Sequence, residues 1–212
     1  MSLLRVCALA LTAVALSSCG AAGPGAAATV DGESISMSTL DDTARVYCEV
    51  TVRQAEQQQG VKAIDNADMR RQAVIDLVLA RVAEDIADER DLKIPTPVDL
   101  DSDQFVETFG AKRAPAVAEA LASAQDLFKL LVVIGADEAA VTATAANSAD
   151  LAEVGRDLAV TAFPEHDVTF APRLGLSDSG ERNGDVGSLS VAPADLEAPT
   201  PDELPGPLAC RV

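Results

Sequence analysis

Apolar residues recur at helical spacing through the middle of this chain, which predicts several long amphipathic helices. One face of the first helix carries Leu40, Ala44, Tyr47 and Val50. Ser36 or Ser38 can cap its start, because a serine hydroxyl accepts a hydrogen bond from an unpaired backbone N–H of the first turn. Gly60 is suited to end it, since glycine readily adopts the left-handed conformation that closes many helices. The first helix is therefore expected to run to Gln59.

A second amphipathic helix is expected to begin at Asn66 or Ala67. Its apolar stripe consists of Val74, Leu77, Val78, Val82 and Ile86. Pro95 and Pro97 mark a break after this helix, because proline lacks the N–H that a helix interior needs. The acidic stretch 99–107 then predicts a further short helix.

A longer helix is predicted to start near Pro115, because proline is favoured in a first turn. Apolar residues continue along it at helical spacing, at Val117, Leu121, Ala124, Phe128 and Leu131. Gly135 is expected to interrupt this helix. Asp137 is then expected to cap another helix, which runs to Leu158 or Phe163 either unbroken or with a break around Asn147.

Strand signals lie at the two ends of the chain. Residues 28–36 predict two short strands joined by an Asp-Gly turn at residues 31–32. Residues 168–170 predict another strand, and residues 188–191 a further one. The proline-rich tail from 199 to 207 is expected to be extended. With helices in the middle, the pattern predicts a mainly α fold with a small β element.

Composition and charge narrow the classes of partner. Aromatic residues make up only 3% of the 212 residues, which favours packed helices over a β-sandwich. The formal net charge is −18. Phosphate backbones would be repelled by such a chain, so we expect no nucleic-acid partner. Binding to an anionic membrane surface through charge alone is disfavoured for the same reason.

The first residues look like an export signal. Arg5 precedes an apolar run over residues 6–16, which is too short to cross a bilayer as a permanent helix, since that takes about 20 apolar residues. The run ends in Leu-Ser-Ser-Cys at residues 16–19, which resembles the lipobox of bacterial lipoproteins. The alternative is an ordinary signal peptide with an incidental cysteine at this position.

The lipobox implies that residues 1–18 are a signal peptide that is removed. The thiol of Cys19 is then expected to carry diacylglycerol, with palmitate among the acyl chains. Several acyl chains would anchor the protein durably to the outer, extracytoplasmic face of a cell membrane. Residues 19–27, rich in glycine and alanine, are expected to form a flexible tether.

The four cysteines fall into three groups. Cys7 would leave with the signal peptide, and Cys19 would be lipidated. Cys48 and Cys210 remain, as an even pair in an oxidising compartment. We predict a disulfide between them; the alternative is two free buried thiols.

Two segments resemble the N-terminal domain of SurA-type and PrsA-type envelope chaperones. Residues 27–36 read Ala-Ala-Thr-Val-Asp-Gly-Glu-Ser-Ile-Ser, and residues 70–81 read Arg-Arg-Gln-Ala-Val-Ile-Asp-Leu-Val-Leu-Ala-Arg. Residues 168–175 resemble the closing segment of short lipoproteins in this group. The resemblance implies a helical domain over residues 28–176, closed by short strands from the N- and C-terminal segments. Residues 177–212 would be a Gly/Pro-rich extension, tied back by the disulfide.

The sequence lacks the residue patterns of the common catalytic and metal-binding sites. Prolyl isomerases of the resembled family carry a parvulin domain with paired histidines, whereas this chain has one histidine, His166, and no room for that domain. We read His166 as a polar residue in a loop or at a helix end. The acidic stretch 99–103 resembles the start of a calcium loop, but Gln104 and Gly110 stand where Gly and Glu are required. We therefore expect no catalytic residues, no metal site and no cofactor.

The leading hypothesis is a membrane-anchored, extracytoplasmic holdase without prolyl isomerase activity. Its partners would be unfolded or exported polypeptides, bound in a shallow apolar groove between the long helices. Leu127, Leu130 and Val133 are candidates for the groove, although core positions have the same pattern. The alternative is a structural or adaptor lipoprotein that binds one envelope partner. A solute-binding protein or enzyme would need two α/β lobes or a catalytic constellation, and neither is visible.

Overall fold

The computed structural model describes residues 23–60, 62–183, 200, 203 and 205–211. The signal peptide predicted at 1–18, the lipidation site Cys19 and the strand predicted at 188–191 lie outside the described residues. Among the described residues, no helix combines the length and the apolar character needed to cross a bilayer. The tail predicted as extended is described only in part.

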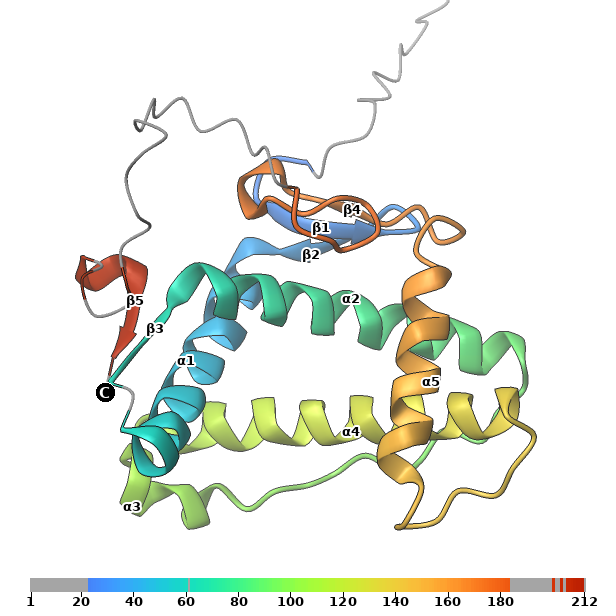
Figure 1. Ribbon diagram of the computed structural model, residues 1–212, viewed down its shortest axis with the longest axis horizontal. Helices are drawn as coiled ribbons and strands as arrows, with labels where there is room; N and C mark the ends of the chain where they lie inside the picture. The colour runs from blue at the N-terminus through green and yellow to red at the C-terminus, as the bar shows by residue number, and fades with distance from the viewer. Residues whose placement is uncertain (1–22, 61, 184–199, 201–202, 204, 212) are drawn as a thin grey trace, which may run out of the picture.

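Four long helices form the body of the domain. They are α1 (Met37–Gln59), α2 (Asn66–Glu89), α4 (Ala114–Glu138) and α5 (Ser148–Thr161). In Figure 1, α2 and α4 run across the view, and α1 and α5 cross them near opposite ends. A 3₁₀ turn (Ser102–Phe105) leads into the short helix α3 (Val106–Phe109). The prediction of a mainly α fold with a small β element is confirmed.

Local signals set the bounds of the first two helices as predicted. The Ser36 hydroxyl accepts the backbone N–H of Thr39 at 3.0 Å, so Ser36 is the cap of α1. Gly60 ends this helix with a left-handed φ of 69°. The Asp65 side chain caps α2 by accepting the N–H of Ala67 at 2.8 Å.

A three-stranded sheet joins the two ends of the folded domain. Strand β1 (Ala26–Val30) pairs antiparallel with β2 (Glu33–Ser36) on one side and with β4 (Thr169–Phe170) on the other. The predicted strands at 28–36 and 168–170 are thereby confirmed. Strand β1 begins within the predicted tether, however, and Ala26 and Ala27 are buried. The prediction of a flexible tether is therefore wrong for Ala26 and Ala27, because both residues belong to this sheet and are buried.

A second, two-stranded sheet packs beside α1. Strand β3 (Ala63–Asp65) pairs antiparallel with β5 (Ala209–Arg211). A 3₁₀ turn (Gly206–Leu208) precedes β5. The prediction of an extended tail through residue 207 is therefore wrong at its end, and neither of these strands was predicted. Both are three residues long, too short to show a period-two pattern.

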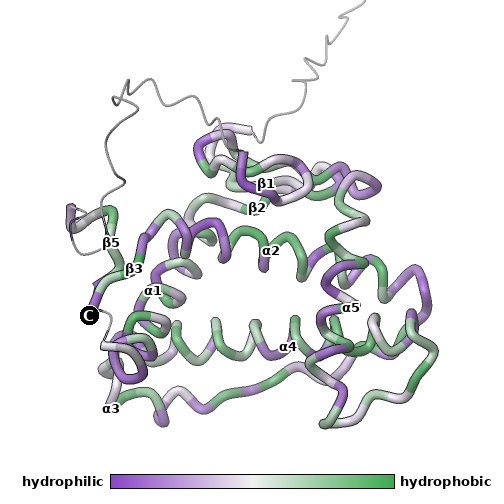
Figure 2. The backbone as a smooth tube through the Cα atoms, in the orientation of Figure 1, coloured by the Kyte–Doolittle hydropathy of each residue, from purple (hydrophilic) through white to green (hydrophobic). Residues whose placement is uncertain are grey.

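The core lies where α2 faces the other helices and the first sheet. The α2 residues Val74, Val78, Val82 and Ile86 are buried, as their stripe predicts. Figure 2 shows apolar residues recurring between polar ones along α2 and α4. Phe163 and Phe170 pack with ring centroids 6.3 Å apart and join the end of α5 to the sheet.

Glycine does not break α4. The helix continues through Gly135 to Glu138, and the next helix starts at Ser148, so the predicted break at Gly135 and the predicted cap at Asp137 are wrong. A Cβ atom on Gly135 would lie 1.9 Å from the carbonyl oxygen of Leu151, and one on Gly155 would lie 2.1 Å from that of Leu131. These glycines allow α4 and α5 to touch backbone to backbone.

Candidate functional site

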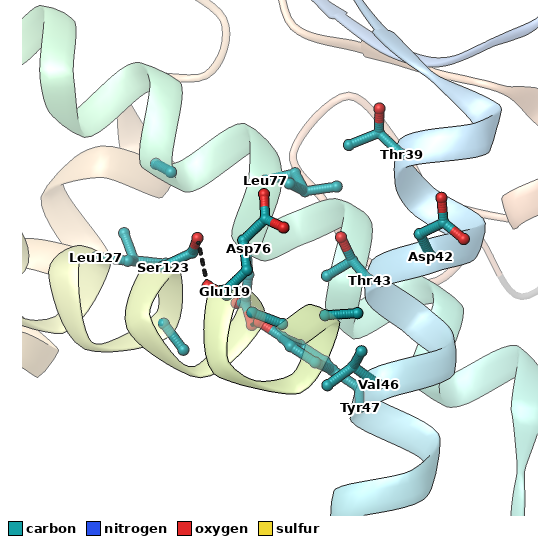
Figure 3. A pocket seen from close by; sticks show the side chains of 14 residues that line it. Thr39, Asp42, Thr43, Val46, Tyr47, Asp76, Leu77, Glu119, Ser123 and Leu127 are labelled. Carbon is teal, nitrogen blue, oxygen red and sulfur yellow. Dashed lines mark hydrogen bonds between the residues drawn. The ribbon is translucent and has the colours of Figure 1, made fainter. Parts of the chain in front are cut away.

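An open groove lies where α1, α2 and α4 meet (Figure 3), with a cavity volume of about 350 Å³. Its lining combines short apolar or hydroxyl side chains with a few larger residues. The lining residues are Thr39, Asp42, Thr43, Val46 and Tyr47 from α1, Asp76, Leu77 and Ala80 from α2, and Ala116, Glu119, Ala120, Ser123, Ala124 and Leu127 from α4. The chain thus supplies a groove between its long helices.

Short side chains produce this groove. On α4, Ala116, Ala120 and Ala124 follow one another at a spacing of four residues, which places them along one face of the helix. Thr39 and Thr43 repeat the same spacing on α1. Where these two helix faces approach each other, the alanine and threonine side chains are too short to fill the space between the helices.

A hydrogen-bonded tyrosine closes one wall of the groove. The Tyr47 hydroxyl donates to Oδ2 of Asp76 at 3.1 Å. The Asp76 side chain is only 17% exposed, and Nη1 of Arg156 lies 3.6 Å from its Oδ1 atom. The Gln72 amide donates to the same oxygen at 2.8 Å. This network holds the Tyr47 ring against α2.

Tyr47 is expected to resist ionisation. Its burial first, and then the Asp76 carboxylate, raise the pKa of the phenol above its ordinary value. The unfolded chain would lose this proton near pH 10, whereas the folded chain would keep it. The contribution of Tyr47 to the stability of the fold is therefore fully present below about pH 10. It is lost as the pH rises above that value, because the unfolded chain then gives up the proton that the folded chain keeps. Because Tyr47 is the single tyrosine of the sequence, absorbance at about 295 nm follows it alone.

The expected titration shows no tyrosinate in the folded protein at a pH where the urea-unfolded chain is largely ionised. Asp76→Asn supplies the control, since it removes the neighbouring charge and should lower the Tyr47 pKa toward its ordinary value. Equal titration curves for the folded and unfolded chain would contradict the buried, hydrogen-bonded tyrosine.

The rim of the groove is acidic. Asp42, Asp76 and Glu119 belong to the lining, and no lysine or arginine does, within the part of the chain that the structure describes. Asp42 forms a 3.0 Å ion pair with Arg45, which is exposed to solvent. The apolar floor and the carboxylates at its edge would favour ligands that are both apolar and basic.

The structure separates the three groove candidates named from the sequence. Leu127 lines the groove. Leu130 is buried in the core instead, and Val133 is half-buried outside the lining. Leu77, predicted as core from its helical stripe, also lines the groove. One helical face supplies both core and groove residues, so the pattern of apolar positions could not tell them apart.

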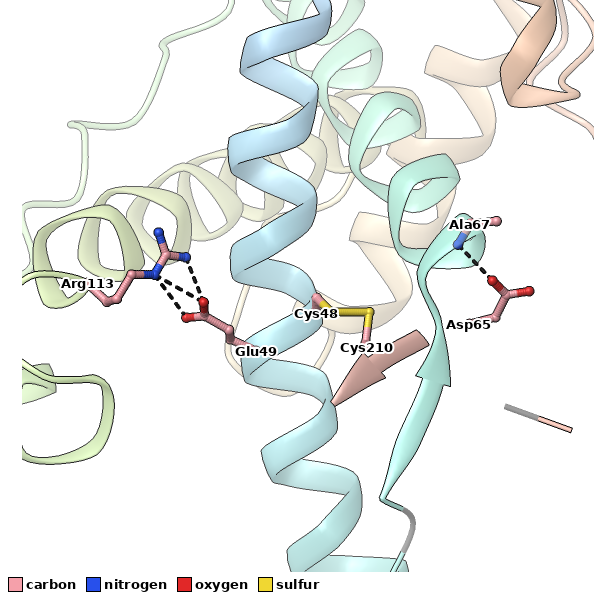
Figure 4. Close-up of a disulfide and its surroundings, with 6 residues drawn as sticks. All are labelled: Cys48, Glu49, Asp65, Ala67, Arg113 and Cys210. Carbon is pink, nitrogen blue, oxygen red and sulfur yellow. Dashed lines mark hydrogen bonds and ion pairs between the residues drawn. A yellow bond between two sulfur atoms is a disulfide. The ribbon is translucent and has the colours of Figure 1, made fainter. Parts of the chain in front are cut away.

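Cys48 and Cys210 form a disulfide, as Figure 4 shows, with their Cα atoms 5.3 Å apart. Cys210 lies in β5 and is only 1% exposed. Next to Cys48 on α1, Glu49 forms a 2.9 Å ion pair with Arg113 at the start of α4. The middle of α1 is thus tied to the C-terminal strand on one side and to α4 on the other.

A second cluster of polar side chains lies beside the first sheet. His166, which follows α5, is only 8% exposed, and its Nδ1 atom lies 3.0 Å from Oδ2 of Asp31 and 3.8 Å from Oδ2 of Asp85. The sequence places His166 in a loop or at a helix end, but gives no sign that it is buried or paired. The three residues are far apart along the chain, so no spacing pattern could bring them together.

Comparison with known proteins finds no family model, no curated protein and no solved structure that matches this chain. The resemblance to SurA-type and PrsA-type domains therefore stays a prediction. Any function has to be argued from the site itself rather than from the fold.

Proposed function

We propose that this protein is a membrane-anchored, extracytoplasmic lipoprotein with a chaperone-like holdase function and no prolyl isomerase activity. The groove between α1, α2 and α4 would receive apolar side chains of unfolded or exported polypeptides. The observation that carries this proposal is the open groove with an apolar floor and an acidic rim. It is the kind of site that the leading hypothesis from the sequence requires.

The size of the groove favours weak and broad binding. Pockets for drug-sized ligands range from roughly 300 to 1,000 Å³, so a cavity of about 350 Å³ would take only one or two side chains of a longer chain. A site that small offers few contacts by which to select one partner. Broad, reversible binding of exposed apolar segments is what a holdase needs, whereas a specific adaptor would need a larger complementary surface.

Charge would set a preference among client segments. Because Asp42 and Glu119 line the groove and no lysine or arginine of the described residues does, segments with apolar residues flanked by basic ones would be favoured. Added salt would weaken that preference, since exposed charges are screened within about 8 Å at physiological ionic strength. Acidic segments would be repelled.

The lipid anchor would keep the groove close to the membrane. If Cys19 carries the lipid, the chain from Cys19 to the start of β1 at Ala26 spans at most about 25 Å. Exported chains that emerge at the extracytoplasmic face would then meet a domain whose first strand is tethered within that distance of the membrane. Lipidation therefore supplies the setting of the proposed activity, and the groove supplies the binding.

Ala120→Trp tests the groove directly. Because Ala120 lines the groove, the indole would occupy part of its space, so this variant should bind an apolar basic peptide on the order of tenfold more weakly. It should also suppress the aggregation of a heat-unfolded protein much less than the unchanged chain does. Gln125→Trp places the same side chain on an exposed position of α4 outside the groove, and it should leave both activities intact.

The peptide assay can use the intrinsic fluorescence of the ligand. Because the sequence contains no tryptophan, a leucine- and lysine-rich peptide with one tryptophan reports its own binding to the unchanged chain. For the tryptophan variants, a dye-labelled copy of the peptide is needed. Equal loss in both variants, or no suppression by the unchanged chain, would reject the groove as a holdase site. Recovery of a single partner without suppression would support the adaptor alternative.

A further inference from the structure

Three side chains that could ligate a metal ion converge beside the first sheet. His166 Nδ1, an Asp31 oxygen and an Asp85 oxygen all lie within 4.8 Å of one another. We propose that Asp31, Asp85 and His166 form a binding site for a divalent transition-metal cation such as Zn²⁺. This proposal does not depend on the holdase function, because the groove lies elsewhere on the molecule.

The distances suit a shared metal ion. Zn²⁺ binds nitrogen and carboxylate oxygen at about 2.0–2.2 Å, which sets neighbouring ligand atoms of a tetrahedral site about 3.3 Å apart. The distances from His166 Nδ1 to the two aspartate oxygens, 3.0 and 3.8 Å, lie on either side of that value. The aspartate oxygens are held only within 4.8 Å of each other, so a metal ion would have to draw these two side chains closer to complete the geometry.

Backbone structure holds two of the ligands in place without a metal. Asp31 lies in the tight turn between β1 and β2 with a left-handed φ of 49°, and its N–H donates to the carbonyl of His166 at 2.8 Å. The N–H of His166 is bonded to the end of α5, at the carbonyl of Ala162, 3.2 Å away. Asp85 projects from the C-terminal part of α2. Three separate elements thus deliver one ligand each to the same point.

The surroundings carry an excess of negative charge. The hollow around His166 has a volume of about 540 Å³, and besides Asp31 and Asp85 it is lined by Glu33, Asp88, Glu89 and Glu165. Arg81 also lines it, but this side chain is paired with Glu33. A buried imidazole that lines such a hollow gives a nitrogen ligand of borderline softness in a field that attracts cations.

The ligand types favour a transition metal over calcium or magnesium. Ca²⁺ and Mg²⁺ prefer a full shell of oxygen atoms, whereas imidazole nitrogen suits Zn²⁺ and its neighbours in the first transition series. On binding, the metal would take the Nδ1 lone pair, and a proton held there would pass to solvent. Three protein ligands leave room for water on the exposed side.

Nuclear magnetic resonance of the imidazole tests the site. His166 is the only histidine of the sequence, so the full chain without a histidine tag gives imidazole signals from this residue alone. Titration with ZnCl₂ is expected to shift these signals and to saturate at one ion per chain. Zinc that binds a cysteine thiol elsewhere in the chain would leave these imidazole signals unchanged.

Matched variants distinguish ligation from general attraction. Asp85→Asn should weaken Zn²⁺ binding at His166 by at least about tenfold. Asp88→Asn removes the same charge from the same hollow and should change it little. Both replacements are at solvent-accessible positions on α2, so the fold should persist. Equal weakening by the two variants, unchanged imidazole signals with ZnCl₂, or equal affinity for CaCl₂ would each overturn the proposal.

Discussion

Replacing Cys48 and Cys210 together with alanine is expected to lower the free energy of unfolding by up to about 5 kcal/mol. The bond joins residues 162 positions apart, so it removes much of the conformational freedom of the unfolded chain. The expected loss approaches the whole stability of many single domains. The C-terminal strand β5 would be the first part to detach, because among the described strands its one partner is β3, which is itself three residues long.

Urea unfolding of the lipid-free chain, followed by circular dichroism, measures this loss. The oxidised protein should unfold at a much higher urea concentration than the double variant. Reductant should bring the oxidised protein to the midpoint of the double variant, and it should leave the variant itself unchanged. Equal midpoints under all conditions, or alkylation of Cys48 and Cys210 themselves in the untreated protein, would mean that the disulfide does not form.

Gly155→Ala is expected to destabilise the protein by about 3 kcal/mol, at the upper end of what overpacking costs. On an isolated helix this change would stabilise by about 1 kcal/mol, since alanine is the better helix former. Here the new Cβ would lie 2.1 Å from the carbonyl oxygen of Leu131, an atom of the backbone of α4. No change of rotamer relieves that overlap, so α4 and α5 must move apart and expose their shared apolar surface.

The same urea experiment gives the sign of this effect. Glu153→Ala, two residues away on the exposed side of α5, serves as the control and should change stability by no more than about 0.5 kcal/mol. Gly135→Ala should destabilise as Gly155→Ala does. The double variant should cost less than the sum, because helices that one methyl group has already separated accept the second more easily. Stabilisation by either single change would show that the two backbones do not touch.

Neighbouring residues carried enough information to predict the ends of α1 and the strands of the first sheet. Ser36 and Gly60 set the ends of α1, because a cap and a left-handed stop act through bonds within one turn. The Asp-Gly turn between β1 and β2 and the strand at 169–170 follow from equally local preferences. Two lone cysteines outside the expected signal and anchor sufficed to predict the disulfide. These features depend on short stretches of chain or on simple counting.

Only the tertiary structure decided what lies between the elements. Gly135 has the sequence pattern of a helix break, and the carbonyl of Leu151, on a different helix, shows instead why it is glycine. The groove exists because alanines of α4 face threonines of α1, and His166 is buried because Asp31 and Asp85 meet it from two other elements. Each of these depends on atoms distant in sequence, and hydrophobic periodicity shows which face of a helix is covered but not what covers it.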